Sequence, residues 1–179
     1  MKRLRRPESW WTALAGVTVL AALAVPATPT HALTRHVCAG TVQTTYDGGL
    51  NDVEKPVGVS GVGSITCPVE PAPHTRGRIT FSNAGLPNQL SCSTGRTGMA
   101  GQITWSDNAT TTFHVAESQV HDVSGVRLLA MRGVVTEGDF AGHQVEAGFP
   151  VSAREHGESC ATARGIDRAT GGITIILTN

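Results

Sequence analysis

The sequence predicts an all-β fold, a single antiparallel β-sandwich or barrel of about eight strands. Beyond residue 32, no long segment repeats apolar residues at the three- and four-residue spacing of a helix, whereas short alternating runs recur. Glycine and threonine interrupt these runs, as turns between strands require. Four cysteines, all beyond residue 32, predict two disulfides that stabilise such a fold.

The first 32 residues have the pattern of a signal peptide. Basic residues at positions 2, 3, 5 and 6 precede a weakly polar to apolar run over residues 10–25, which Pro26 ends. Thr30 to Ala32 form a small-x-small site, so we expect cleavage after Ala32. A membrane anchor is the alternative, but the run is shorter than the roughly 20 residues that a spanning helix needs. The expected organisation is a signal peptide over residues 1–32 and a secreted, extracellular β domain over residues 33–179.

The charge of the expected mature chain argues against two classes of partner. The leader contains four of the 14 basic residues and one of the 14 acidic residues, so its removal leaves a formal charge of −3. No polybasic run remains, so we expect neither nucleic acid nor an anionic membrane as a partner. The remaining length suits one domain that buries a core without a metal, and we expect a monomer with no cofactor.

The four cysteines are Cys38, Cys67, Cys92 and Cys160. Of the three possible pairings we favour Cys38 with Cys67 and Cys92 with Cys160, because the first bridge would then staple neighbouring strands and the second would tie a middle loop to a late one. Each bridge would contribute roughly 3–4 kcal/mol by restricting the unfolded chain. A zinc site is the alternative, but no C-x-x-C pair occurs.

Three elements are expected before the middle of the chain. Residues 36–46, 57–66 and 78–83 are strands, the last with Ile79 and Phe81 pointing inward. Residues 67–75 contain three prolines and form a loop. Residues 85–98, rich in serine, threonine and glycine, form a long loop that Cys92 orders.

A β-hairpin over residues 101–116 is the centre of the predicted fold. Residues 103–105 and 110–115 flank a polar tip at residues 106–109. Ile103 and Trp105 share a face with Phe113 and Val115 only if the turn contains an odd number of residues, which predicts a three- or five-residue loop.

Three strands are expected in the last third of the chain. Residues 126–135 are nearly all apolar, and their inward face is ambiguous. Residues 137–142 form a turn, residues 145–151 alternate around Phe149, residues 154–167 form a polar loop, and residues 173–177 form the last strand around Ile175. The expected core is Ile79, Phe81, Ile103, Trp105, Phe113, Val115, Phe149 and Ile175.

Several groups of polar residues were weighed for chemistry, and each has a structural interpretation that we favour. Glu155, His156, Glu158 and Cys160 lack metal-ligand spacing. A hydrolase triad could combine His114, or His121 with Asp122, with the hydroxyl of Ser118 or Ser124. Such a triad is defined by three-dimensional geometry, which the sequence does not give, and the chain contains no G-x-S-x-G elbow. The sequence therefore predicts no catalytic residue, no cofactor-binding residue and no metal ligand.

The remaining polar and aromatic candidates are also assigned to the fold. We expect Asp139 and His143 to hold a turn through side chain to backbone hydrogen bonds. Glu117, Glu137 and Glu146 are expected on wet faces, Asn108 in a turn, and Trp105 and Tyr46 in no sugar-stacking platform.

Four stretches of the chain form distinctive motifs: G-x-I-T-W-x-x-x-x-T-T-x-F at residues 101–113, GVVTEGDFAG at residues 133–142, the Cys160 loop, and ATGGITIIL at residues 169–177. In these motifs the chain resembles a group of small secreted proteins of actinomycetes. The resemblance implies an export signal, four cysteines and an all-β body. That group has no established activity, and its motifs are those of strands and turns, so the resemblance implies no catalytic residue.

We expect this protein to bind an extracellular ligand or partner without catalysis, because folding needs explain its notable residues. A secreted protease inhibitor that presents residues 90–97 around Cys92 is the alternative. A small hydrolase is the third hypothesis.

Overall fold

The computed structural model describes residues 34–68, 74–123, 126–151 and 160–179. Within these ranges the chain forms strands β1 (Arg35–Leu50), β2 (Gly58–Thr66), β3 (Arg76–Ser82), β4 (Asn88–Leu90), β5 (Gly95–Thr97), β6 (Met99–Trp105), β7 (Thr110–Val123), β8 (Val126–Gly138), β9 (Gln144–Pro150) and β10 (Ile166–Thr178). By compactness the chain divides into Met1–His31, which lies outside the described residues, and Ala32–Asn179. In the described part of the chain, we find no helix with the length and apolar character needed to cross a membrane.

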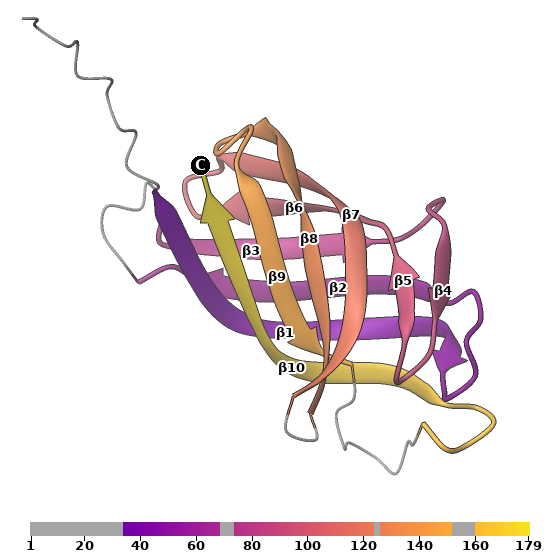
Figure 1. The fold of residues 1–179 in the computed structure, drawn as a ribbon. Helices are drawn as coiled ribbons and strands as arrows, with labels where there is room; N and C mark the ends of the chain where they lie inside the picture. The colour runs from indigo at the N-terminus through magenta and orange to yellow at the C-terminus, as the bar shows by residue number, and fades with distance from the viewer. Residues whose placement is uncertain (1–33, 69–73, 124–125, 152–159) are drawn as a thin grey trace, which may run out of the picture. The chain divides into compact units, whose positions relative to one another are not determined.

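Eight of the strands form a closed antiparallel barrel, which decides between the two predicted architectures. The strand order is β1-β10-β9-β8-β7-β6-β3-β2, and β2 returns to β1. Each barrel strand therefore pairs with its neighbours along the chain, and β1 pairs with β10 from Arg35 opposite Thr178 to Leu50 opposite Ile166. The barrel is a meander in which β4 and β5, inserted between β3 and β6, form a separate hairpin (Figure 1).

The turn of the central hairpin contains an odd number of residues, as the alternation of its two strands requires. The Trp105 amide donates to the Ala109 carbonyl at 2.9 Å, which leaves a three-residue loop at residues 106–108. Within the loop, the Asn108 amide donates to the Trp105 carbonyl at 3.0 Å, and Asn108 adopts a left-handed φ of 69°. A tight turn followed by one left-handed residue is the usual three-residue hairpin. The predicted loop length is confirmed.

Side chains fill the interior of the barrel. Phe81 on β3 and Phe149 on β9 come from opposite walls and stack with ring centroids 5.3 Å apart. The rings of Phe81 and Phe113 occupy the space where Gly61 and Gly101 lack a side chain. None of the eight side chains expected in the core is more than 5% exposed. An eight-stranded barrel is just wide enough for its interior to be filled in this way.

Both predicted disulfides are present with the favoured pairing. Cys38 in β1 bonds to Cys67 directly after β2, and so links neighbouring strands. Cys92, in the turn between β4 and β5, bonds to Cys160 in the connection that leads to β10. The second bridge ties two connections that are 68 residues apart in the sequence.

The barrel has two differently built ends. We call the end with the turns at residues 106–108 and 139–143, together with His74 before β3, the histidine end. The opposite end, where the β4–β5 hairpin and the connection between β1 and β2 lie, is the β4–β5 end.

Several element predictions were incomplete, including those for β1, which continues from residue 46 to Leu50, and β8, which continues from residue 135 to Gly138. Residues 85–98 were expected to be a loop but contain β4 and β5, which are too short to show alternation. β7 continues to Val123 through a bulge between Val115 and Glu117, so its buried positions change from odd to even numbers and the alternation breaks. β10 begins at Ile166, well before the predicted start at residue 173. Its first half contains Ala169 and two glycines in place of larger apolar residues, so the alternation there is weak.

Candidate functional site

Ser118, considered above as a nucleophile, holds the β4–β5 hairpin to the barrel. Its hydroxyl donates to the Thr97 carbonyl at 2.5 Å and accepts from the Thr97 amide at 3.0 Å. His114, His121 and Asp122 are exposed, and no hydrogen bond between His121 and Ser118 occurs within the described ranges. Ser124 lies outside the described residues. Ser118 is thus committed to a structural contact, which does not favour the triad hypothesis.

The residues weighed as metal ligands or paired acids are dispersed. Residues 155–159 lie outside the described part of the chain, and Cys160 is bonded to Cys92. The Asp52 carboxylate lies within 4.8 Å of both sulfurs, but joined sulfurs are not the thiolates that bind metals. Glu146 pairs with Arg132 at 3.2 Å and Glu137 is exposed, whereas the side chain of Glu117 is not described.

The structure also places the two aromatic residues and the turn carboxylate that the sequence analysis assigned to the fold. Trp105 and Tyr46 are each only 2% exposed, so neither is a surface platform for sugars. Asp139 was expected to hold its turn by a hydrogen bond to the backbone, and this is wrong, because its carboxylate contacts His74 Nε2 at 2.6 Å. His74 comes from a connection 65 residues earlier, so local sequence could not indicate the contact.

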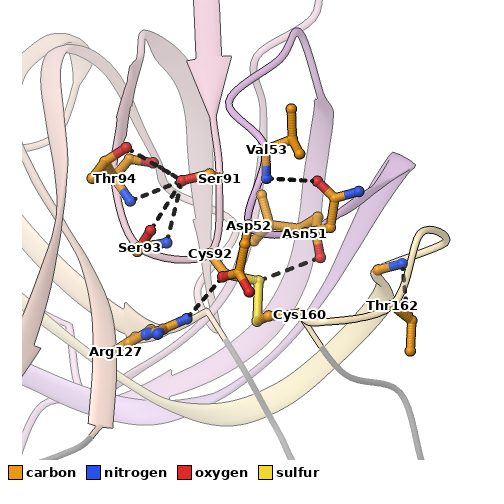
Figure 2. The surroundings of a disulfide bond; sticks show 12 residues. Asn51, Asp52, Val53, Ser91, Cys92, Ser93, Thr94, Arg127, Cys160 and Thr162 are labelled. Atoms are coloured by element: carbon orange, nitrogen blue, oxygen red, sulfur yellow. Dashed lines mark hydrogen bonds and ion pairs between the residues drawn. A yellow bond between two sulfur atoms is a disulfide. The ribbon is translucent and has the colours of Figure 1, made fainter.

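The Cys92 turn, whose surroundings are drawn in Figure 2, offers little of its chain to a protease. Leu90, Ser91 and Cys92 are at most 2% exposed, and the Cys92 amide donates to the Asn51 carbonyl at 2.7 Å. The Ser91 hydroxyl caps the turn through the Ser93 and Thr94 amides. Within the turn only Ser93 and Thr94 are exposed. An inhibitory loop presents an extended exposed segment, so this geometry counts against the inhibitor hypothesis.

A groove on the outer wall of the barrel is the best candidate for a binding site. Three adjoining hollows, of about 450, 620 and 380 Å³, share Gln119 on β7. The first extends over the outer faces of β8, β9 and β10, and the other two lie between β7 and the β4–β5 hairpin. Figure 1 shows where these strands lie in the barrel. We call these three hollows together the Gln119 groove.

Strand register explains why the wall is hollow at this point. Gln119, Ala130, Gly148 and Thr174 are successive partners in one row across β7, β8, β9 and β10. Ala130 and Gly148, the small residues in the middle of this row, form the floor. The neighbouring row contains Arg132 and Glu146, which rise above the floor as an exposed ion pair.

The lining of the Gln119 groove combines polar and apolar side chains and has little net charge. Arg132 and Glu146 pair with each other. Beyond Gln119, the lining includes Glu54 and Arg96, again one acid and one base, together with amide and hydroxyl side chains. Such a surface offers hydrogen bonds in both directions without an electrostatic preference for a charged ligand.

The sequence patterns did not predict this groove, although Gly148 could have indicated a gap in the outer wall. Gly148 occupies an outward position in a strand that otherwise alternates well, and a glycine there leaves a gap in the surface. A side chain at this position would find only the Leu129 carbonyl oxygen, 3.9 Å away, within 4 Å. The other groove residues cannot be grouped without the strand register.

Comparisons of the chain with protein-family models, with curated proteins and with solved structures give no match.

Proposed function

We propose that this protein is exported and binds an uncharged polar ligand in the Gln119 groove, without catalysing a reaction. The observation that supports the proposal most directly is the contrast between a filled barrel interior and a hollowed outer wall. Eight-stranded barrels that bind small molecules inside need an open interior. Here a ligand has access to the wall, where side-chain amides and hydroxyls are available.

The proposal of export is supported by sequence and structure together. The first 32 residues have the basic, apolar and small-x-small pattern of a signal peptide. Two disulfides, with no free cysteine in the described residues, are compatible with an oxidising compartment.

The test of the binding proposal is to fill the groove without changing the fold. Gly148→Leu places a side chain over the groove floor, where the backbone leaves room. Gly172→Leu is the matched control, because Gly172 lies on β10 outside the groove lining and is equally open. Both proteins should retain the unfolding free energy of the parent chain within about 1 kcal/mol.

Binding would be followed by NMR with uncharged polar probes, N-acetylglucosamine oligomers and maltohexaose. We expect amide shifts at Gln119, Ala130 and Thr174 in the parent chain and in Gly172→Leu, and none in Gly148→Leu. Shifts that persist in Gly148→Leu, or no shifts with either probe, would contradict the proposal.

Protease inhibition is the second proposal carried forward from the sequence. The buried positions of Leu90, Ser91 and Cys92 count against it. Incubation of the purified protein with a panel of extracellular serine proteases tests it, and an absence of inhibition at micromolar protein would remove it.

A further inference from the structure

His74 lies at the histidine end, where it contacts two separate turns. Its imidazole stacks on Trp105 with ring centroids 4.9 Å apart and planes inclined by 12°. Nδ1 lies 3.0 Å from Asp107 Oδ2 in the β6–β7 turn, and Nε2 lies 2.6 Å from Asp139 Oδ2 in the β8–β9 turn. The His74 side chain is 6% exposed, whereas the two carboxylates are 55% and 52% exposed. One buried ring therefore connects β3 to two turns.

We propose that His74 is a pH-dependent clasp, which holds the turn at residues 106–108 against the barrel while its ring is protonated and releases that turn when the ring loses a proton. An ionised carboxylate only accepts hydrogen bonds, and a ring nitrogen donates only when it carries hydrogen. The imidazolium alone has hydrogen on both nitrogens and can donate to Asp107 and Asp139 together. Its positive charge also faces the Trp105 ring, where a cation is stabilised.

Loss of one proton places a nitrogen lone pair against a carboxylate, and we expect this repulsion at Asp107. The contact to Asp139 is the shorter of the two, and shorter charge-assisted bonds are stronger, so the remaining hydrogen stays on Nε2. The Asp139 backbone is also anchored, since its amide donates to the Thr110 carbonyl at 2.8 Å and its carbonyl accepts from the Thr111 hydroxyl at 2.9 Å.

The turn at residues 106–108 has fewer attachments to the rest of the barrel. The Ser106 amide donates to the Arg76 carbonyl at 3.1 Å. Asp107 Oδ1 accepts from the Ala109 amide at 3.2 Å, but this bond lies within the hairpin. Deprotonation of His74 therefore loosens residues 106–108 and leaves residues 139–143 in place.

Two further histidines at this end are separated from the clasp by Phe140. The Phe140 ring centroid lies 5.0 Å from that of His36, 5.5 Å from that of His143 and 6.0 Å from that of His74. Arg76, two residues after His74, is exposed. Among the described residues, Asp107 and Asp139 are the charged groups that contact the His74 ring.

Amide hydrogen exchange measured from about pH 5 to about pH 8 tests the clasp. After correction for intrinsic exchange, protection of the Ser106 amide should fall about tenfold as the pH rises, which is about 1.4 kcal/mol. Protection of the Ala141 and His143 amides, which bond within the β8–β9 turn, should change less than about twofold. Equal protection of Ser106 across this range would overturn the proposal.

Two variants separate the clasp from general stability. His74→Phe keeps a ring over Trp105 but removes both donors, so the pH dependence of Ser106 protection should disappear. Asp107→Asn, in which an amide can donate to an unprotonated Nδ1, should also remove it while the barrel stays folded. His114→Gln changes an exposed histidine on β7 and should leave the profile unchanged. A pH dependence that persists in Asp107→Asn would overturn the proposal even if His74→Phe does not fold.

Discussion

The two ends of the barrel are closed by different interactions. At the β4–β5 end, a disulfide is accompanied by buried amide side chains that bind the backbone. The Asn83 side chain donates to the Val57 carbonyl and accepts from the Val59 amide. The Asn51 side chain donates to the Ala163 carbonyl. At the histidine end, an imidazole between two carboxylates stacks on an indole. Each end also has a disulfide, since Cys38–Cys67 lies at the histidine end and Cys92–Cys160 at the β4–β5 end. The ends differ in that neutral amide side chains support the β4–β5 end and an imidazole between carboxylates supports the histidine end. A change of pH should therefore act mainly on the histidine end, whereas reduction should act on both.

The largest expected effect concerns the disulfide of the β4–β5 end. Replacement of Cys92 and Cys160 by alanine should lower the unfolding free energy by about 4–5 kcal/mol, because the bridge closes a loop of 68 residues. The same change at Cys38 and Cys67, which are 29 residues apart, should cost about 1 kcal/mol less. Urea unfolding of both variants measures the difference. An equal or reversed order would show that loop closure does not govern this end.

A comparable loss is expected at the histidine end from Trp105→Ala. The substitution removes the ring under His74 and the bond from Trp105 Nε1 to the Thr111 hydroxyl at 2.8 Å. It should cost about 3–5 kcal/mol, as for other buried aromatic residues. Val62→Ala, on the outer wall, is the control and should cost under about 1 kcal/mol. A near-zero change for Trp105→Ala would mean that the aromatic stack does not stabilise this end.

Tyr46→Phe should raise the unfolding free energy by about 1 kcal/mol. The Tyr46 hydroxyl is buried without a hydrogen-bond partner among the described residues, and such a group costs stability that a phenylalanine avoids. Burial also raises the pKa of Tyr46, because the folded protein disfavours the phenolate. The folded state is therefore not penalised at pH values below the ordinary pKa of a phenol, but it loses stability as the pH rises above that pKa.

Tyr46 is the only tyrosine in the chain, so its ultraviolet absorbance reports this titration directly. The phenolate band should develop only when the barrel unfolds, and Tyr46→Phe should remove this part of the alkaline loss. A phenolate band that develops in the folded protein near the ordinary pKa would contradict the prediction.

The smallest effect is expected from His36→Gln. Burial and the positive charge of His143 lower the pKa of His36, so the folded state disfavours its charged form. The stability that His36 contributes as a neutral side chain is therefore present above its unfolded-state pKa and is lost as the pH falls. The variant should lose less stability than the parent between about pH 7 and pH 5, by under about 0.5 kcal/mol because the site is partly solvated. Unfolding midpoints at the two pH values measure this difference. A greater loss of stability at the lower pH in the variant than in the parent would contradict the prediction.

Sequence patterns predicted the barrel wall better than its ends. The turn after Trp105 and the inward set of the central hairpin follow from a period of two, which local sequence records. Both disulfide pairings were predicted because pairing in sequence order would join neighbouring strands with the first bridge and tie a middle loop to a late one with the second. The clasp was missed because Asp107 and Asp139 follow His74 by many residues, and only the closed barrel brings their turns to it.

The Gln119 groove shows a second limit of sequence reasoning. Its floor depends on which small residues become partners across strands, as Ala130 and Gly148 do. A bulge before Glu117 shifts the register of β7 by one position, so alternation alone would assign Gln119 to the wrong face. Local patterns do not determine cross-strand partners beyond a bulge.

The pairing of β1 with β10 also constrains when this protein can fold. Every other strand of the barrel pairs with its neighbours along the chain, but the wall closes only when the first strand meets the last. During synthesis, one edge of β1 therefore stays unpaired until β10 has been made. Completion of the barrel is a late event, and a chain threaded through a membrane would stay open until its final strand arrives.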